Sequence, residues 1–194
     1  MPDCGTQDVV DHAMGLMLGR MKGINRWDSR LRAAPKEWNQ RDNSNALRLS
    51  AAKVGIVGLG RMRAARGLRC KAFGMEVPFF DPYVSNGSDL ALNTLGRDSL
   101  EALFSASHIV KLHVPLSDGT RACQPGLVLI NVTRGEVADI VAIYRGLQAV
   151  QFDSIGIDVM PEEPSNMDRS LIQAWRREGE WIKDRVLIAP HCAF

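Results

Sequence analysis

The sequence predicts an α/β fold built on a doubly wound parallel sheet, and two observations predict it. Short aliphatic and β-branched runs alternate along the chain with longer segments of helical periodicity, which is the order of strands and helices in a parallel sheet. One unit of this pattern, from Val54 to Asp81, also carries a Gly-x-Gly turn between its first strand and its helix. We therefore expect helices on both faces of one sheet.

Composition limits the class of protein. The chain has 194 residues, of which 45% are hydrophobic and 24% charged, enough for one sizeable core. A net charge of +2 is too small to favour nucleic acid or a membrane surface, so neither is expected as a partner. The cysteines are scattered without a C-x-x-C pair, which predicts neither a metal site nor a disulfide framework and fits a reduced cytoplasm. They are Cys4, Cys70, Cys123 and Cys192.

The first fifty residues are expected to form a helix and an arm. An apolar stripe at helical spacing predicts a packed helix over residues 8–21. The stripe consists of Val10, Ala13, Met14, Met17 and Met21. Residues 22–50 are polar and irregular, with Trp27 and Trp38 as the only large anchors, and we interpret them as a connecting arm.

Strands and helices alternate again in the second half of the chain. A capping-box pair, Asp98 and Glu101, predicts the start of a helix that runs through Leu103 and Phe104. Further strands are expected at 109–114, 127–132, 155–159 and 186–189. Helices are expected between them at 138–150 and 168–177. Because helices separate the strands, the sheet is expected to be parallel.

The unit at 54–81 has the outline of a dinucleotide-binding fold. Gly58 allows the sharp turn out of the first strand, and Gly60 lets the backbone approach a pyrophosphate at the N-terminus of the helix. Asp81 follows Gly60 by about 20 residues, the spacing of an acid that hydrogen-bonds the adenosine ribose and disfavours a 2′-phosphate. NAD is therefore predicted rather than NADP. A nucleotide-free α/β unit with a tight turn is the structural alternative.

Two residues depart from the pattern of this unit. Arg63 occupies the position of the third glycine of G-x-G-x-x-G, where a long side chain should push the helix off the strand or extend towards solvent. Either outcome should weaken cofactor binding. Pro78 lies in the second strand, where its missing N–H removes a ladder hydrogen bond unless a bulge accommodates it.

Three residues suited to chemistry follow predicted strand ends, where open parallel sheets bind ligands. They are Arg134, Glu163 and His191. A carbonyl reduction needs a cation to hold an oxyacid, a proton donor for the new hydroxyl, and a carboxylate that keeps the donor protonated. Each residue also has a structural alternative: a solvated turn residue, one of two exposed acids, or a near-terminal residue without a role.

The remaining histidines are interpreted as structural. His12 lies on the first predicted helix, and His108 and His113 flank a predicted strand. No second ligand is spaced along the sequence to complete a metal site with them, so no metal is predicted.

The sequence resembles one known family in seven segments. In chain order these are VGIVGLGRM, KAFGMEV, FDPY, LHVPL, NVTRGEV, IDVMPEEP and APHCAF. They look like the signature segments of the NAD-binding domain of D-isomer-specific 2-hydroxyacid dehydrogenases, a Rossmann-type domain. The stretches FDPYVSNGSDLAL and LIQAWRREGEWIKDRVLIAPHCAF are most similar to the branch related to C-terminal-binding proteins. The resemblance covers nearly the whole chain.

The resemblance also implies a site. The family's catalytic Arg, Glu and His match Arg134, Glu163 and His191. His191 as imidazolium would protonate the substrate oxygen as nicotinamide delivers hydride, Glu163 would raise the imidazole pKa, and Arg134 would bind the substrate's carboxylate and carbonyl. The residues implied in cofactor binding are Gly58, Leu59, Gly60, Arg61, Met62, Asp81, Pro115, Thr120, Val132, Thr133, Arg134, Asp158 and His191.

The function implied by the resemblance is an NAD-dependent oxidoreductase of a D-2-hydroxy acid or the corresponding 2-oxo acid. Residues 1–50 would be a leading interdomain-type helix and arm, and residues 51–194 the dinucleotide-binding domain. The family's second, substrate domain is expected to be missing, and the family's habit implies a homodimer. Two alternatives stay open: a catalytically silent NAD(H)-binding regulatory module, and an inactive remnant.

Overall fold

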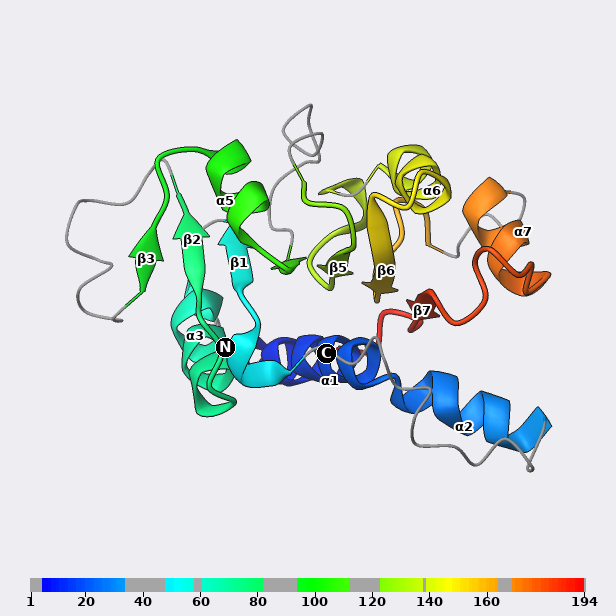
Figure 1. Cartoon of the computed structure of the whole chain (residues 1–194), viewed down its shortest axis with the longest axis horizontal. Helices are drawn as coiled ribbons and strands as arrows, with labels where there is room; N and C mark the ends of the chain where they lie inside the picture. The colour runs from blue at the N-terminus through cyan, green and yellow to red at the C-terminus, as the bar shows by residue number, and fades with distance from the viewer. Residues whose placement is uncertain are drawn as a thin grey trace.

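A parallel sheet of seven strands runs through the centre of the molecule, in the order β3-β2-β1-β4-β5-β6-β7 (Figure 1). The computed structural model describes residues 5–33, 48–57, 61–81, 94–111, 123–137, 139–163 and 169–193. The strands are β1 (Val54–Val57), β2 (Pro78–Phe80), β3 (Leu95–Gly96), β4 (Ile109–Lys111), β5 (Leu127–Asn131), β6 (Phe152–Ile157) and β7 (Val186–Ile188). Every described strand pair is parallel, which confirms the predicted fold class.

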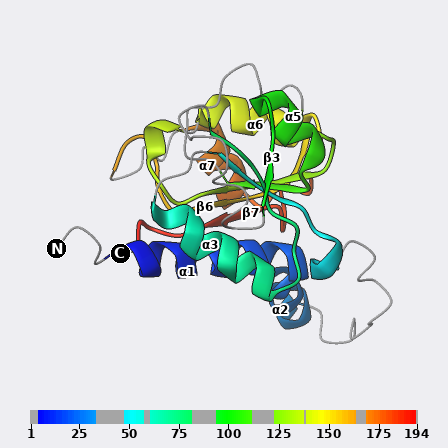
Figure 2. The same ribbon diagram turned by 90° about the vertical axis from the view of Figure 1, so that its left-hand side faces the viewer.

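Helices cover both faces of the sheet. They are α1 (Thr6–Lys22), α2 (Ile24–Ala33), α3 (Arg61–Ala72), α5 (Leu100–Ala106), α6 (Ile140–Gln148) and α7 (Ser170–Arg176), with 3-10 turns at Leu49–Ala51 and Gly135–Val137. Figures 1 and 2 show α1 and α3 on one face and α5, α6 and α7 on the other. The strand order reverses between β1 and β4, the switch point beside which doubly wound sheets bind ligands. Among the described helices, none combines the length and apolar character needed to cross a bilayer.

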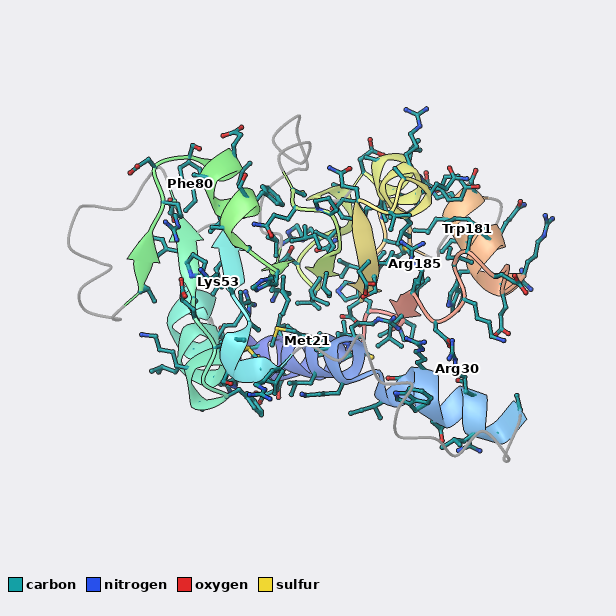
Figure 3. The ribbon with its side chains drawn as sticks, in the orientation of Figure 1. Met21, Arg30, Lys53, Phe80, Trp181 and Arg185 are labelled. Atoms are coloured by element: carbon teal, nitrogen blue, oxygen red, sulfur yellow. The ribbon has the colours of Figure 1, made fainter. Side chains whose placement is uncertain are left out.

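The first helix packs directly on the sheet. All five residues of its predicted stripe are buried, and Met14, Met17 and Met21 belong to a core cluster shared with β1 and α3, as expected for packing residues. Figure 3 shows Met21 on the side of α1 that faces the sheet. The close approach depends on Gly156 of β6, because a Cβ there would lie 3.3 Å from Leu16 Cβ and 2.9 Å from the end of Ile130. The prediction of a packed leading helix is therefore confirmed.

The prediction of an irregular arm over residues 22–50 is wrong in part, because it contains α2. No residue of this helix is buried, but Ile24, Trp27 and Leu31 recur at helical spacing, so the sequence does contain a short pattern that predicts it. Polar contacts stabilise the helix. The guanidinium groups of Arg26 and Arg30 lie over the ring of Trp27, 5.5 and 5.7 Å from its centroid. Arg30 Nε also lies 3.1 Å from Asp184 Oδ2. Figure 3 shows Arg30 on the side of α2 nearest the C-terminal region. Trp38, the second expected anchor, lies outside the described residues.

The helix predicted from Asp98 and Glu101 forms, but its capping box is wrong. The N-cap of α5 is Ser99, whose Oγ accepts a hydrogen bond from Ala102 N at 3.1 Å. Ser99 has the extended backbone that an N-cap requires, so the helix begins one residue later than the box would place it. The short strand β3, at Leu95–Gly96, was not predicted.

The other predicted elements form with ends shifted by a few residues. The largest described shift is at β6, which begins at Phe152 instead of residue 155. The predicted strand at 109–114 is observed as β4, and its last three residues lie outside the described part of the chain. Pro78 is the first residue of β2, a position where the missing N–H of proline is tolerated, so no bulge is needed.

We predict that Gly156→Val destabilises the protein by about 1–3 kcal/mol, because the added side chain must displace Leu16 and Ile130 from between α1 and the sheet. Urea unfolding followed by circular dichroism measures the change. Gly15→Ala is the matched control: it lies on an exposed part of α1 with no atom within 4 Å of an added Cβ, and should be neutral or stabilising by up to about 1 kcal/mol. Equal stability of Gly156→Val and wild type would contradict the close packing of α1.

Candidate active site

The turn after β5 is shaped by the buried side chain of Asn131, the last residue of that strand. Its Oδ1 accepts hydrogen bonds from Thr133 N at 3.2 Å and Thr133 Oγ1 at 3.0 Å, and its Nδ2 donates to Arg134 O at 3.1 Å. These bonds satisfy both ends of a buried amide and fix the backbone of the turn. The side chain of Arg134 is thereby carried on a defined backbone and stays exposed.

The turn after β5 lies against the loop after β6. Asp158 N donates to Asn131 O at 2.9 Å, which joins the two segments where they leave the sheet. Further out, Gly135 meets Met160 and Pro161 so closely that a Cβ at Gly135 would lie 1.9 Å from Met160 C and O. No residue with a side chain fits this contact. The loop that carries Glu163 is therefore held beside the turn that carries Arg134.

Glu163 and His191 form a hydrogen-bonded pair. Glu163 Oε1 accepts a hydrogen bond from Met160 N at 3.0 Å, and its Oε2 lies 2.5 Å from His191 Nδ1. The contact at Nδ1 orients the imidazole ring and leaves Nε2 as the nitrogen that can exchange a proton with another molecule. Both side chains are accessible to solvent, with 56% of His191 and 38% of Glu163 exposed.

Electrostatics favour the charged form of both members of this pair. The hydrogen bond to Glu163 raises the pKa of His191 above 6.5, the positive charge of Arg134 opposes this weakly, and the slight burial of the ring also lowers it. The hydrogen bond from His191, together with that from Met160 N, lowers the pKa of Glu163 below 4.5. The two shifts agree in sign, since each partner stabilises the charge of the other.

Asp158 holds the C-terminal segment in place. Its carboxylate is 1% exposed and accepts hydrogen bonds from Cys192 N at 3.0 Å and Ala193 N at 3.2 Å. Its carbonyl oxygen accepts a third from His191 N at 2.7 Å. His191 adopts a left-handed backbone, with a φ of 51°, which these bonds stabilise. The position of the imidazole therefore depends on Asp158.

Three features of the sheet fit a dinucleotide. The helix α3 begins at Arg61 shortly after β1 ends, so its N-terminal N–H groups lie at the edge where the strands end. Asp81 follows β2 directly, beside β1 and on that same edge. Arg134 and His191 follow β5 and β7, across the switch point from Asp81. The edge is therefore acidic on one side of the switch point and carries the Arg and His side chains on the other.

The predicted site residues divide into those that the structure describes and those that it does not. Gly58, Leu59, Gly60, Pro115 and Thr120 lie outside the described residues. Arg61, Met62 and Arg63 begin α3, and only their backbone is described, so the effect of Arg63 stays a prediction. The remaining residues lie at the carboxyl edge of the sheet: Asp81, Val132, Thr133, Arg134, Asp158, Glu163 and His191.

Sequence reasoning missed two residues that build this site. Asn131 lies within a segment quoted for the family resemblance, and a polar residue ending a buried strand is the signal that could have found it. His12 was interpreted as a packing residue without a ligand nearby. In the structure its Nε2 lies 3.1 Å from Asp158 Oδ1, a proximity that no sequence spacing indicates.

The fold and this edge define an α/β domain of the dinucleotide-binding type, with a hydrogen-bonded Glu–His pair at the carboxyl edge of its sheet. A comparison with protein families identifies the kind of dinucleotide-binding domain. Residues 14–193 match the family described as D-isomer specific 2-hydroxyacid dehydrogenase, NAD binding domain. The chain belongs to this family, whose cofactor is NAD.

Individual relatives agree with the family. D-3-phosphoglycerate dehydrogenase of Archaeoglobus fulgidus is 26% identical over 99% of this chain and 36% of its own length. Glyoxylate reductase of Korarchaeum cryptofilum is 32% identical over 72% of this chain and 42% of its own. The solved structure of D-lactate dehydrogenase from Aquifex aeolicus, in complex with NAD and lactic acid, superimposes with a TM-score of 0.80 at 25% identity, over all of this chain and 62% of that one. The chain thus spans less than two thirds of each relative.

We predict that Glu163→Gln lowers the pKa of His191, because the neutral amide no longer stabilises the imidazolium. An NMR pH titration of the imidazole resonances measures it. The resonance of His108, which accepts a hydrogen bond from Lys53 N through Nδ1, is the internal control and should not respond.

The stability that the Glu163–His191 pair contributes depends on pH in the direction that its two pKa shifts set. The raised pKa of His191 and the lowered pKa of Glu163 keep the pair fully charged between pH 4.5 and 6.5, their ordinary values. Its contribution to stability disappears as pH falls through the pKa of Glu163 and as pH rises through that of His191. A His191 titration that is identical in wild type and Glu163→Gln would contradict the pairing.

Proposed function

We propose that this chain is the cofactor domain of an NAD-dependent oxidoreductase that interconverts D-2-hydroxy acids and 2-oxo acids. One observation carries the proposal: a hydrogen-bonded Glu163–His191 pair lies beside the turn of Arg134, at the carboxyl edge of a dinucleotide-binding sheet. The family assignment supports it, and its relatives are named for reactions of small 2-hydroxy or 2-oxo acids.

The three side chains have separable roles in this reaction. Arg134, exposed on a rigid turn, binds the carboxylate of the acid and polarises its carbonyl. His191 donates the proton on Nε2 to the oxygen that becomes the hydroxyl, and Glu163 keeps the ring protonated through Nδ1. Bound NADH supplies the hydride. In the oxidation direction neutral His191 accepts the hydroxyl proton at Nε2.

The cofactor would lie across the carboxyl edge of the sheet. The backbone N–H groups at the start of α3 would meet the pyrophosphate, and Asp81 would hydrogen-bond the adenosine ribose. We propose cofactor roles for the other predicted residues on that edge as well, Thr133 and Asp158 among them. Residues 51–194 would form the dinucleotide-binding domain, with residues 1–50 as a leading segment whose α1 packs on the sheet.

We further propose a cytoplasmic homodimer that does not bind nucleic acid or membranes. The described cysteines Cys70, Cys123 and Cys192 are all free, as is usual in a reducing compartment, and the net charge is only +2. The family resemblance supports the dimer. A sedimentation mass equal to one chain at micromolar concentration would contradict it.

We predict that the protein binds NADH more tightly than NADPH, because the carboxylate of Asp81 repels a 2′-phosphate. Asp81→Asn should reduce this preference by strengthening NADPH binding. Titration of cofactor fluorescence measures both affinities. Glu76→Gln is the control, since Glu76 is an acid before the other end of β2, paired with Lys53 at 3.6 Å, and should leave the preference unchanged. No saturable binding of either cofactor would refute the proposed cofactor site.

We predict that the chain oxidises NADH in the presence of glyoxylate, hydroxypyruvate or pyruvate, and that His191→Gln lowers kcat by about 10²–10⁴-fold. Loss of NADH absorbance measures turnover.

Glu163→Gln should shift the pH profile of reduction to lower pH, because His191 then loses its proton at lower pH. Glu162→Gln, a neighbouring acid paired with Arg169 at 2.9 Å, is the control and should leave the profile unchanged. Cofactor binding without turnover would instead favour the catalytically silent module.

A further inference from the structure

Three potential metal ligands meet where the beginning and the end of the chain come together. His12 of α1, Asp158 after β6 and Cys192 near the C-terminus each contribute one ligand atom, and these atoms all lie within 4.8 Å of one another. His12 Nε2 is 3.1 Å from Asp158 Oδ1, and Cys192 Sγ is 3.7 Å from the same oxygen. One nitrogen, one oxygen and one sulfur therefore lie close enough together to bind one ion.

Two of the three separations between these atoms are close to the edge lengths of a tetrahedral metal site. A Zn²⁺ ion bound at about 2.0–2.1 Å from nitrogen and oxygen and about 2.3 Å from sulfur sets its ligand atoms about 3.3–3.6 Å apart. The distances of 3.1 Å from His12 Nε2 and 3.7 Å from Cys192 Sγ to Asp158 Oδ1 lie within a few tenths of an ångström of that range. Imidazole, carboxylate and thiolate together favour a borderline cation such as Zn²⁺ over Mg²⁺ or Ca²⁺, which prefer oxygen alone.

The hydrogen bonding of the cluster leaves room for an ion. His12 Nε2 is shielded from solvent and, among the described residues, has no hydrogen-bond partner, although it lies close to Asp158. Asp158 Oδ1 accepts hydrogen bonds from Cys192 N and from the thiol of Cys192, whose proton a bound ion would displace. Asp158 Oδ2 accepts one hydrogen bond, from Ala193 N, and keeps a lone pair for a further ligand. The imidazole nitrogen therefore faces a carboxylate oxygen without the geometry of a hydrogen bond, as two ligands of one ion do.

Charge and access also suit a divalent cation. A carboxylate and a thiolate together carry two negative charges, which one divalent ion neutralises, and Asp158 is too buried for water to do so. Cys192 is exposed, so an ion can reach the cluster from solvent. Burial raises the pKa of Cys70 to about 11 and of Cys123 to about 12, so neither buried thiol competes as a thiolate ligand.

We propose that His12, Asp158 and Cys192 form a binding site for Zn²⁺ or a similar borderline divalent cation. Binding deprotonates the thiol of Cys192, whose proton passes to the buffer, and water occupies the fourth position of the ion. The site ties α1 to the segment that carries His191. Asp158 is also one of the residues proposed for cofactor binding, but the test measures binding of an ion to the chain without NAD, so its outcome is independent of the oxidoreductase function.

Titration of Co²⁺ into the chelator-treated full chain tests the proposal. We expect one equivalent to bind, with the visible bands of tetrahedral Co²⁺ and a thiolate charge-transfer band in the near ultraviolet, and Zn²⁺ to abolish both. Affinity should rise with pH, because the ion displaces a proton. Absence of saturable binding, or binding without a charge-transfer band, would overturn the proposal.

Two substitutions and one control locate the ion. Removing a residue that hydrogen-bonds to a metal ligand lowers metal affinity by about 10–100-fold. Removing a ligand itself, in Cys192→Ser or His12→Gln, should therefore lower Co²⁺ affinity by at least as much. Cys192→Ser should also remove the charge-transfer band. Cys123→Ala, at a buried thiol before the amino end of β5, should bind Co²⁺ as wild type does. Circular dichroism shows that each variant is folded, and unchanged Co²⁺ affinity in either ligand variant would refute the three-residue site.

Discussion

The buried carboxylate of Asp158 is the constraint on which the rest of the site depends. A carboxylate without contact to water must be compensated by hydrogen bonds or charge, and here the backbone N–H groups of Cys192 and Ala193 supply them. The same residue accepts from His191 N and donates to Asn131 O through its main chain. One residue therefore fixes the C-terminal segment, the turn after β5 and the end of β6 relative to one another.

The acid–base pair follows from that arrangement. Because the C-terminal segment is held at Asp158, the imidazole of His191 reaches Glu163, and because Gly135 admits the backbone of Met160 and Pro161, the loop that carries Glu163 stays beside the turn after β5. Neither side chain needs burial to be held in position. The pair stays exposed, which limits its contribution to stability and leaves its proton accessible to other molecules.

The sheet explains why side chains far apart in the sequence meet at one edge. All described strands run in parallel, so every loop after a strand leaves on the same side. The helix α1 lies across β5 and β6, where Gly156 admits it, and this brings His12 to Asp158. The residues proposed to bind a cation and those proposed to transfer a proton are thus neighbours through Cys192 and His191, although their roles are separate.

The amino-acid sequence could predict the parallel α/β fold, the packed leading helix and the residue types at the carboxyl edge of the sheet. It could do so because hydrophobic periodicity records local burial, and because Arg134, Glu163 and His191 each follow a recognisable strand. Two differences between sequence and structure are local: Ile24, Trp27 and Leu31 have helical spacing in α2, and Ser99 stands beside Asp98 as a second suitable cap. The meeting of His12, Asp158 and Cys192, in contrast, is visible only in the folded chain. That meeting depends on contacts between distant segments, which strand order and helix placement set and which no local pattern records.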